Sequence, residues 1–196
     1  MKRKIVKKQK DEIYNDSWIY ILLLSTLVIL LESLKNFTLD IGGATIMYSI
    51  FLLPLVYLIT NYILKKYDYK KAIAAICLSA TALVVFAVIM SFALRERFLI
   101  SSVSGEFCGY VASQFVSLTI YNFLLNNTKS HIILVYLNYI FSLIIFYMFY
   151  TIIYLNMVIL DSFWKSYFAT LAIQIFICLP IAAIDKKIKR GREIIK

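Results

Sequence analysis

Long apolar runs recur along almost the whole chain, and they constrain its fold more than any other feature. Each run is close to the roughly 20 residues that a helix needs to cross a bilayer core. The runs cover residues 18–34, 45–64, 72–94, 106–125, 132–155 and 166–184. Apolar residues make up 62% of the chain, more than a soluble core of this size can bury. The sequence therefore predicts an integral membrane protein with the lipid bilayer as its surroundings.

The composition of the runs favours helices over membrane-spanning strands. Barrel strands alternate polar and apolar residues, whereas these runs are apolar on every face. We therefore expect an all-α polytopic fold, a bundle of about six transmembrane helices over residues 18–184. Basic tails, 1–17 and 185–196, flank this domain. The stretch 36–45, which contains Gly42-Gly43, is predicted to form a tight external turn.

The basic residues predict the orientation of the bundle. The two tails and the turns 65–71 and 126–131 hold 17 of the 21 lysines and arginines, and six spans would place all of these on one side. Because positive charge marks the cytoplasmic side, both termini are expected in the cytoplasm. The net charge of +10 is explained by topology and anionic lipid, so no nucleic-acid partner is expected.

Enzyme chemistry and metal binding find no support in the sequence. The three cysteines form no C-x-x-C pair, and the chain has one histidine. Glu32, Glu106, Asp161 and Asp185 fall near the ends of spans, and no charged residue falls near a midplane. We expect no catalytic residue, no metal and no cofactor, an uncharged binding site, and no carboxylate proton relay.

Uncharged polar residues inside the spans are the candidate binding groups, because a polar group in hydrocarbon needs a partner. The fourth run carries small residues every four positions, at Gly105, Gly109, Ser113 and Ser117. This small-residue strip suits close helix packing or a seam for a partner protein. The candidate substrate-binding residues are Tyr57, Asn61, Ser113, Gln114, Asn138 and Gln174. Each amide is either an interhelical hydrogen bond or a substrate contact.

Tyr57 and Asn61 are four residues apart and therefore share one helical face. Pro54 lies one turn earlier and would free a backbone carbonyl there. Such a face could hydrogen-bond and stack a small planar ligand.

These residues carry a family resemblance. The run from Pro54 through Tyr57 and Asn61 to Lys71, the segment 112–115 and Leu179-Pro180 together resemble the queuosine precursor transporter family, also called vitamin uptake transporter-like (VUT). The resemblance implies a multi-pass carrier of about six helices in the plasma (inner) membrane of a bacterium, with 7-deazaguanine bases as the family's substrates. Tyr57, Ser113, Gln114 and Pro180 match that pattern, whereas the family usually has Asp at Asn61 and Glu at Lys65.

The sequence and this resemblance lead to two functional hypotheses. The first is an uptake carrier for a small neutral molecule, 7-deazapurine-like or vitamin-like. It would act as a facilitator, as the binding subunit of an energy-coupling complex, or as a homo-oligomer. The alternative is a non-transporting interaction or accessory protein that retains the carrier fold.

Overall fold

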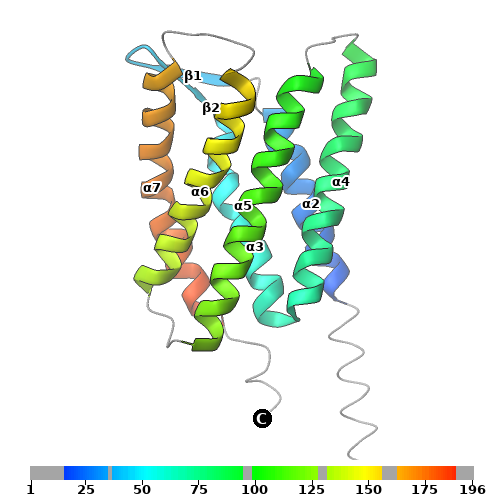
Figure 1. The fold of residues 1–196 in the computed structure, drawn as a ribbon, viewed down its shortest axis with the longest axis vertical. Helices are drawn as coiled ribbons and strands as arrows, with labels where there is room; N and C mark the ends of the chain where they lie inside the picture. Colours follow the sequence, from blue (N-terminus) through cyan, green and yellow to red (C-terminus); the bar gives the residue numbers. More distant parts are fainter. Residues whose placement is uncertain (1–15, 35–36, 95–98, 128–131, 156–162, 189–196) are drawn as a thin grey trace, which may run out of the picture.

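In the part of the chain that the computed structural model describes, five long helices and one short helix form a bundle (Figure 1). The structure describes residues 16–34, 37–94, 99–127, 132–155 and 163–188. The helices are α2 (Ser17–Leu34), α3 (Leu53–Lys66), α4 (Tyr69–Leu94), α5 (Leu99–Asn127), α6 (Ile132–Leu155) and α7 (Phe163–Lys187). The predicted all-α class is confirmed. The range predicted for the fifth span, 132–155, coincides with α6.

A small antiparallel hairpin, β1 (Thr38–Ile41) and β2 (Ala44–Met47), lies at one end of the bundle (Figure 1). Its register pairs Thr38 with Met47 and Ile41 with Ala44. Gly42 and Gly43 form the two-residue loop with φ of 59° and 82°, the left-handed conformation that such hairpin turns require. The predicted tight turn is therefore confirmed. We call this end the hairpin end, and the end at which α2 begins and α7 ends the basal end.

The second predicted span differs most from the structure. It was expected to be one helix over 45–64, but β2 and a 3-10 turn (Tyr48–Phe51) occupy its first part. Pro54 lies in the first turn of α3, where its missing N–H removes no helical hydrogen bond. Pro54 therefore helps to begin a helix. The prediction that it frees a carbonyl inside one is wrong.

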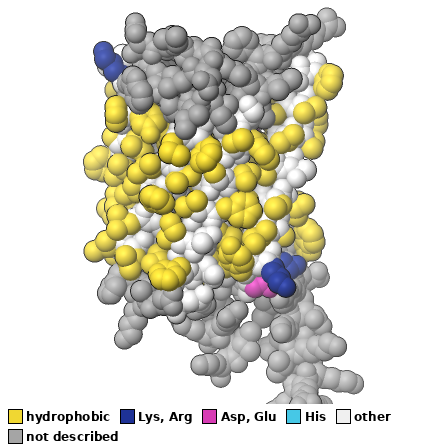
Figure 2. All heavy atoms as spheres, viewed as in Figure 1, with side chains coloured by type: hydrophobic (Ala, Val, Ile, Leu, Met, Phe, Trp, Pro, Cys, Tyr) yellow, Lys and Arg dark blue, Asp and Glu magenta, His cyan; other side chains and the backbone are white. Residues whose placement is uncertain are grey.

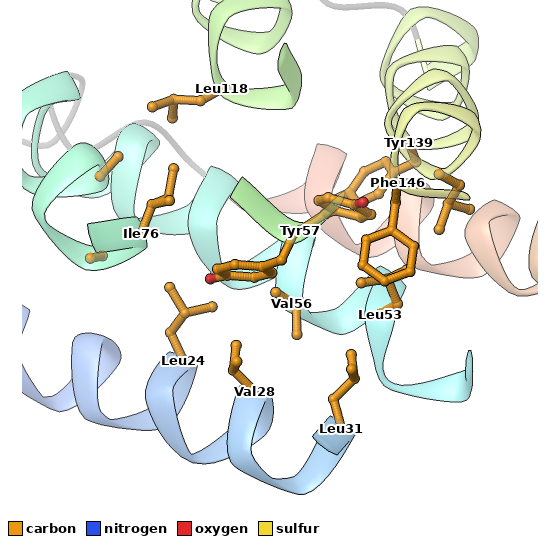
Figure 3. Packing of buried hydrophobic residues seen from close by; sticks show 14 of the residues in the cluster. Leu24, Val28, Leu31, Leu53, Val56, Tyr57, Ile76, Leu118, Tyr139 and Phe146 are labelled. Carbon is orange, nitrogen blue, oxygen red and sulfur yellow. The ribbon is translucent and has the colours of Figure 1, made fainter. Parts of the chain in front are cut away.

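The short helix α3 lies at the centre of the bundle. All fourteen of its residues are buried or half-buried, and it contacts each of the five long helices. Apolar side chains of α2, among them Leu24 and Val28, point toward Val56 on α3 (Figure 3). At about 1.5 Å per residue, α3 extends about 21 Å, less than the bilayer core of about 30 Å. The hairpin and the 3-10 turn, which precede α3 in the chain, occupy the remaining length toward the hairpin end of the bundle.

The five other helices are long and apolar enough to cross a membrane. Large apolar side chains on them point outward, as in Phe92 and Phe176, which are 80% and 78% exposed. Apolar side chains cover the middle of the visible face, and the Lys and Arg side chains drawn there lie toward its two ends (Figure 2). This surface is suited to acyl chains. The basic tails lie mostly outside the described residues, but α7 continues to Lys187, past the domain boundary expected at 184.

Candidate functional site

A single carboxylate, that of Asp185 on α7, gathers donors from three other helices. Lys65 on α3 places its ammonium 2.7 Å from Oδ1 of Asp185 and also donates to the Asp185 backbone carbonyl. Tyr121 on α5 donates to Oδ1 at 2.7 Å, and Tyr139 on α6 donates to Oδ2 at 3.0 Å. Asn61 Nδ2 lies 3.5 Å from Oδ2. We call these five residues the Asp185 cluster.

The Asp185 cluster is closed to the surroundings. The side chain of Asp185 is 0% exposed and that of Lys65 is 6% exposed. A buried charge is tolerated when it is paired and its remaining valences are hydrogen-bonded, and here both carboxylate oxygens have such donors. The expectation of an uncharged binding site does not hold at Asn61, which lies 3.5 Å from the Asp185 carboxylate, although Asp185 is near the end of its span as predicted. Lys65 was assigned to a turn, but it belongs to the last turn of α3 and points inward.

The chain has a signal for this cluster that the sequence reasoning missed. Tyr57, Asn61 and Lys65 recur every four residues, so they share one face of a helix. In the structure all three side chains on that face are buried. Extending the Tyr57–Asn61 face by one further turn would have predicted that Lys65 is buried in the bundle.

Tyr57 lies one helical turn closer to the hairpin end than Asn61, in a second polar layer. Its hydroxyl donates to the Ser142 backbone carbonyl at 3.3 Å, and its ring meets the Tyr139 ring edge-on with centroids 6.2 Å apart. Ser113 on α5 lies beside the same hydroxyl, and its own hydroxyl donates to the Tyr110 carbonyl at 3.0 Å. The structure therefore brings two predicted residues, Tyr57 and Ser113, together.

Gln114 follows Ser113 and is the least satisfied of the predicted residues. Its side chain is 0% exposed, and among the described residues neither Oε1 nor Nε2 has a hydrogen-bond partner. Buried polar groups in proteins are almost always partnered, and leaving one unpaired costs about 1–3 kcal/mol. Gln114 thus retains a donor and an acceptor that the described part of the chain does not use.

The remaining amides are partly satisfied. Asn138 donates to the Ser117 hydroxyl at 3.1 Å and lies buried between α5 and α6. The carbonyl oxygens of Asn138 and Asn61 have no partner within the described ranges. Gln174 is buried beside Tyr147, nearer the hairpin end than the Asp185 cluster. The six predicted residues are thus all buried, and they lie on four different helices, α3, α5, α6 and α7.

The small-residue strip of α5 packs inside the chain. A Cβ on Gly109 would lie 2.8 Å from the backbone oxygen of Phe146 on α6, and Ser117 accepts the Asn138 hydrogen bond. The strip therefore brings α5 and α6 into close contact, as small residues do at helix interfaces. The alternative that the strip forms a seam for a partner protein is wrong, because α6 of the same chain already covers it.

At the basal end, an aromatic cage surrounds Lys66. Its ammonium lies 4.8 Å from the ring centre of Tyr20, 5.6 Å from that of Tyr62 and 5.4 Å from that of Tyr67. Burial raises the pKa of the Tyr67 phenol, so the Tyr67 ring stays neutral and holds the lysine by cation–π attraction. One tyrosine from α2, one from α3 and one from the stretch after α3 thus hold the same cation.

Two cavities in the described part of the chain have other linings. One of about 400 Å³ is an apolar groove between α5 and α6, lined by Ile120, Leu137, Phe141 and their neighbours, with Asn138 as its polar residue. The other, of about 90 Å³, is polar and lies at the basal end, lined by Lys65, Tyr67, Asp68, Tyr69, Asn122, Asn126, Leu64 and Leu125. Gln114 and Asn61 line neither of these two.

The arrangement of long apolar helices around a polar centre defines a multi-span membrane protein. Comparisons with protein-family models, curated proteins and solved structures gave no match to this chain. The resemblance to the queuosine precursor transporter family therefore stays a prediction.

Proposed function

We propose that the protein is a carrier for uptake of a small neutral molecule. The observation that carries this proposal is Gln114, whose amide is fully buried and unused among the described residues. Retaining such an amide in an apolar bundle costs free energy, and a ligand that supplies both partners would repay that cost. A primary amide presents N–H donors and a carbonyl acceptor side by side, which suits an uncharged polar ligand.

The surroundings of Gln114 suit such a ligand as well. Tyr57 and Ser113 lie at the same level of the bundle, and Asn61, whose carbonyl oxygen has no partner among the described residues, follows one turn nearer the basal end. Aromatic rings beside hydrogen-bonding groups favour a planar ligand. The groups at this level are uncharged, whereas the paired charges of Lys65 and Asp185 lie closer to the basal end. The proposal therefore keeps a neutral substrate, vitamin-like or 7-deazapurine-like as the resemblance suggests.

Orientation and coupling complete the proposal. The basal end, which carries the basic tails, would face the cytoplasm of a bacterial cell. Movement of helix groups around the centre of the bundle would give alternating access. The carrier would act as a facilitator, as a homo-oligomer or as the binding subunit of an energy-coupling complex.

Ligand binding followed by transport tests the proposal. Purified protein in detergent is screened by thermal shift against purines, 7-deazapurines and vitamins, and any hit is then offered to protein reconstituted in liposomes. We expect uptake that falls at least ten-fold in Gln114→Ala and Asn61→Ala. Leu118→Met is the matched control, because Leu118 is fully buried on the same helix but apolar. No hit in the panel, together with cellular uptake unchanged by both alanine variants, would reject the carrier.

A further inference from the structure

The Asp185 cluster lies between the basal cavity and the inner polar layers. Lys65 lines the polar cavity of about 90 Å³ on one side and contacts Asp185 on the other. Since water occupies about 30 Å³, this cavity has room for a few molecules. The order along α3 from the basal end is the cavity, the Lys65–Asp185 pair, Asn61 and then Tyr57. The ion pair thus lies between a polar pocket large enough for water and the candidate binding layers.

The same pair joins the helices that would have to move apart if the bundle opened at its basal end. Asp185 joins α7 to α3 through Lys65, to α5 through Tyr121 and to α6 through Tyr139. Buried ion pairs contribute little net stability relative to apolar packing, because desolvation offsets their attraction. Their geometry is nevertheless specific. Because such a contact is not the main source of stability, it can break and form again while the rest of the bundle stays folded.

We propose that the Lys65–Asp185 pair is a gate that closes the basal end of the bundle. Opening the gate would connect the basal cavity with the layer of Asn61 and Tyr57. This inference rests on the proposed carrier function and adds the device that alternating access needs at this end. The experiment below reads the gate without any substrate, so that it can fail separately from the carrier.

Cys178 supplies a natural reporter for the opening. It lies seven residues before Asp185 on α7, so it is about two turns higher on nearly the same face. It is 0% exposed and lies near the Tyr57 hydroxyl, beyond the pair as seen from the basal end. A chain carrying Cys77→Ala and Cys108→Ala leaves this thiol as the reporter. A charged, membrane-impermeant methanethiosulfonate is then applied from the basal side of proteoliposomes.

We expect slow modification of Cys178 in this parent chain and at least ten-fold faster modification with Asp185→Asn. The double variant Lys65→Gln/Asp185→Asn leaves no unpaired charge and should also react at least ten-fold faster. Lys187→Gln, at an exposed position of the same helix, is the matched control and should react at the parent rate. Correct folding is checked by size-exclusion chromatography and thermal unfolding in detergent.

Parent-like protection of Cys178 in the folded double variant would overturn the gate. Failure of both charge variants to fold would also count against it, because the contacts of a gate break in a working cycle without unfolding the protein. Absence of uptake alongside faster labelling would reject the carrier and keep the gate. Uptake alongside unchanged labelling would reject the gate alone.

Discussion

Lys65 and Asp185 are separated by 120 residues in the chain, yet their charged groups meet at 2.7 Å inside the bundle. The contact joins the central short helix to the last helix, and two tyrosine hydroxyls complete the carboxylate's shell. Charge-assisted hydrogen bonds of this kind are the stronger ones in proteins. Removing one charge therefore leaves the other buried without its counter-charge.

Neutralising one of the two charges of the Lys65–Asp185 pair should destabilise the protein strongly. We expect Asp185→Asn to lower the free energy of unfolding by about 3–5 kcal/mol, because the Lys65 ammonium is left buried without a counter-charge. Lys65→Gln/Asp185→Asn should cost less than Asp185→Asn alone. Unfolding in detergent, followed by circular dichroism, measures both. Lys65→Gln alone completes the double-mutant cycle, and additive effects of the two single variants would contradict a direct pairing.

Replacement of Gln114 by an apolar side chain of similar size should change the free energy of unfolding in the opposite direction and stabilise the protein. Gln114→Met removes a buried amide that has no partner in the described part of the chain, so we expect the free energy of unfolding to rise by about 1 kcal/mol or more. Uptake by the same variant should fall. Thermal unfolding of ligand-free protein measures the first effect, and liposome uptake measures the second.

Asn138 provides the contrast for this prediction. Its amide donates to Ser117, so Asn138→Leu removes a real interhelical hydrogen bond and should lower stability by about 0.6–2 kcal/mol. If Gln114→Met proves as destabilising as Asn138→Leu, the Gln114 amide makes a stabilising contact in the free protein and is not held in reserve for a ligand.

Much of the fold could be predicted from hydropathy alone, because in lipid a long apolar run must satisfy its own backbone as a helix. This argument placed α6 correctly and α2 to within one residue. It was wrong for residues 45–52, where apolar content is high but the chain pairs with β1 and then meets Pro54. Hydropathy does not distinguish a strand from a helix in a short apolar segment.

The candidate site was harder to predict, because its contacts depend on how the helices are aligned along their axes. Tyr57, Asn61 and Gln114 were correctly expected to be buried. That Asp185 would meet Lys65, however, follows from the depth of α7 relative to α3, which periodicity within one helix does not encode. A lysine beside a turn was also assumed to face water, although four-residue spacing placed it on the buried face.

Close contact between α5 and α6 depends on Gly109. A methyl group there would lie 2.8 Å from the Phe146 backbone oxygen and 3.3 Å from its ring, so the backbones would have to move apart. We expect Gly109→Ala to lower the free energy of unfolding by about 1–3 kcal/mol, and Gly109→Leu by more. Thermal unfolding in detergent measures both. Thr119→Ala, at an exposed position of the same helix, should change stability little, and an equal loss there would show that the effect is not specific to the α5–α6 contact.

The hairpin turn allows backbone strain to be tested without any packing change. Gly42 has φ of 59°, and a Cβ built on it meets nothing within 4 Å. A substitution there consequently acts only through the left-handed backbone, which costs an ordinary residue about 1–2 kcal/mol. We expect Gly42→Val to lower the free energy of unfolding by about that amount, measured by thermal unfolding in detergent. Gly42→Asn should lose less than half as much, since asparagine tolerates this conformation better than branched residues do.

The contrast between the two Gly42 variants separates backbone strain from any other role of the hairpin. Both add a side chain of moderate size to open space, but only valine is strongly disfavoured at positive φ. Equal losses in Gly42→Val and Gly42→Asn would mean that a contact made by the turn, and not its conformation, sets the cost. A loss of stability in Gly42→Val alone would show that the left-handed turn stabilises the hairpin. It would then also stabilise the contact between β2 and α7.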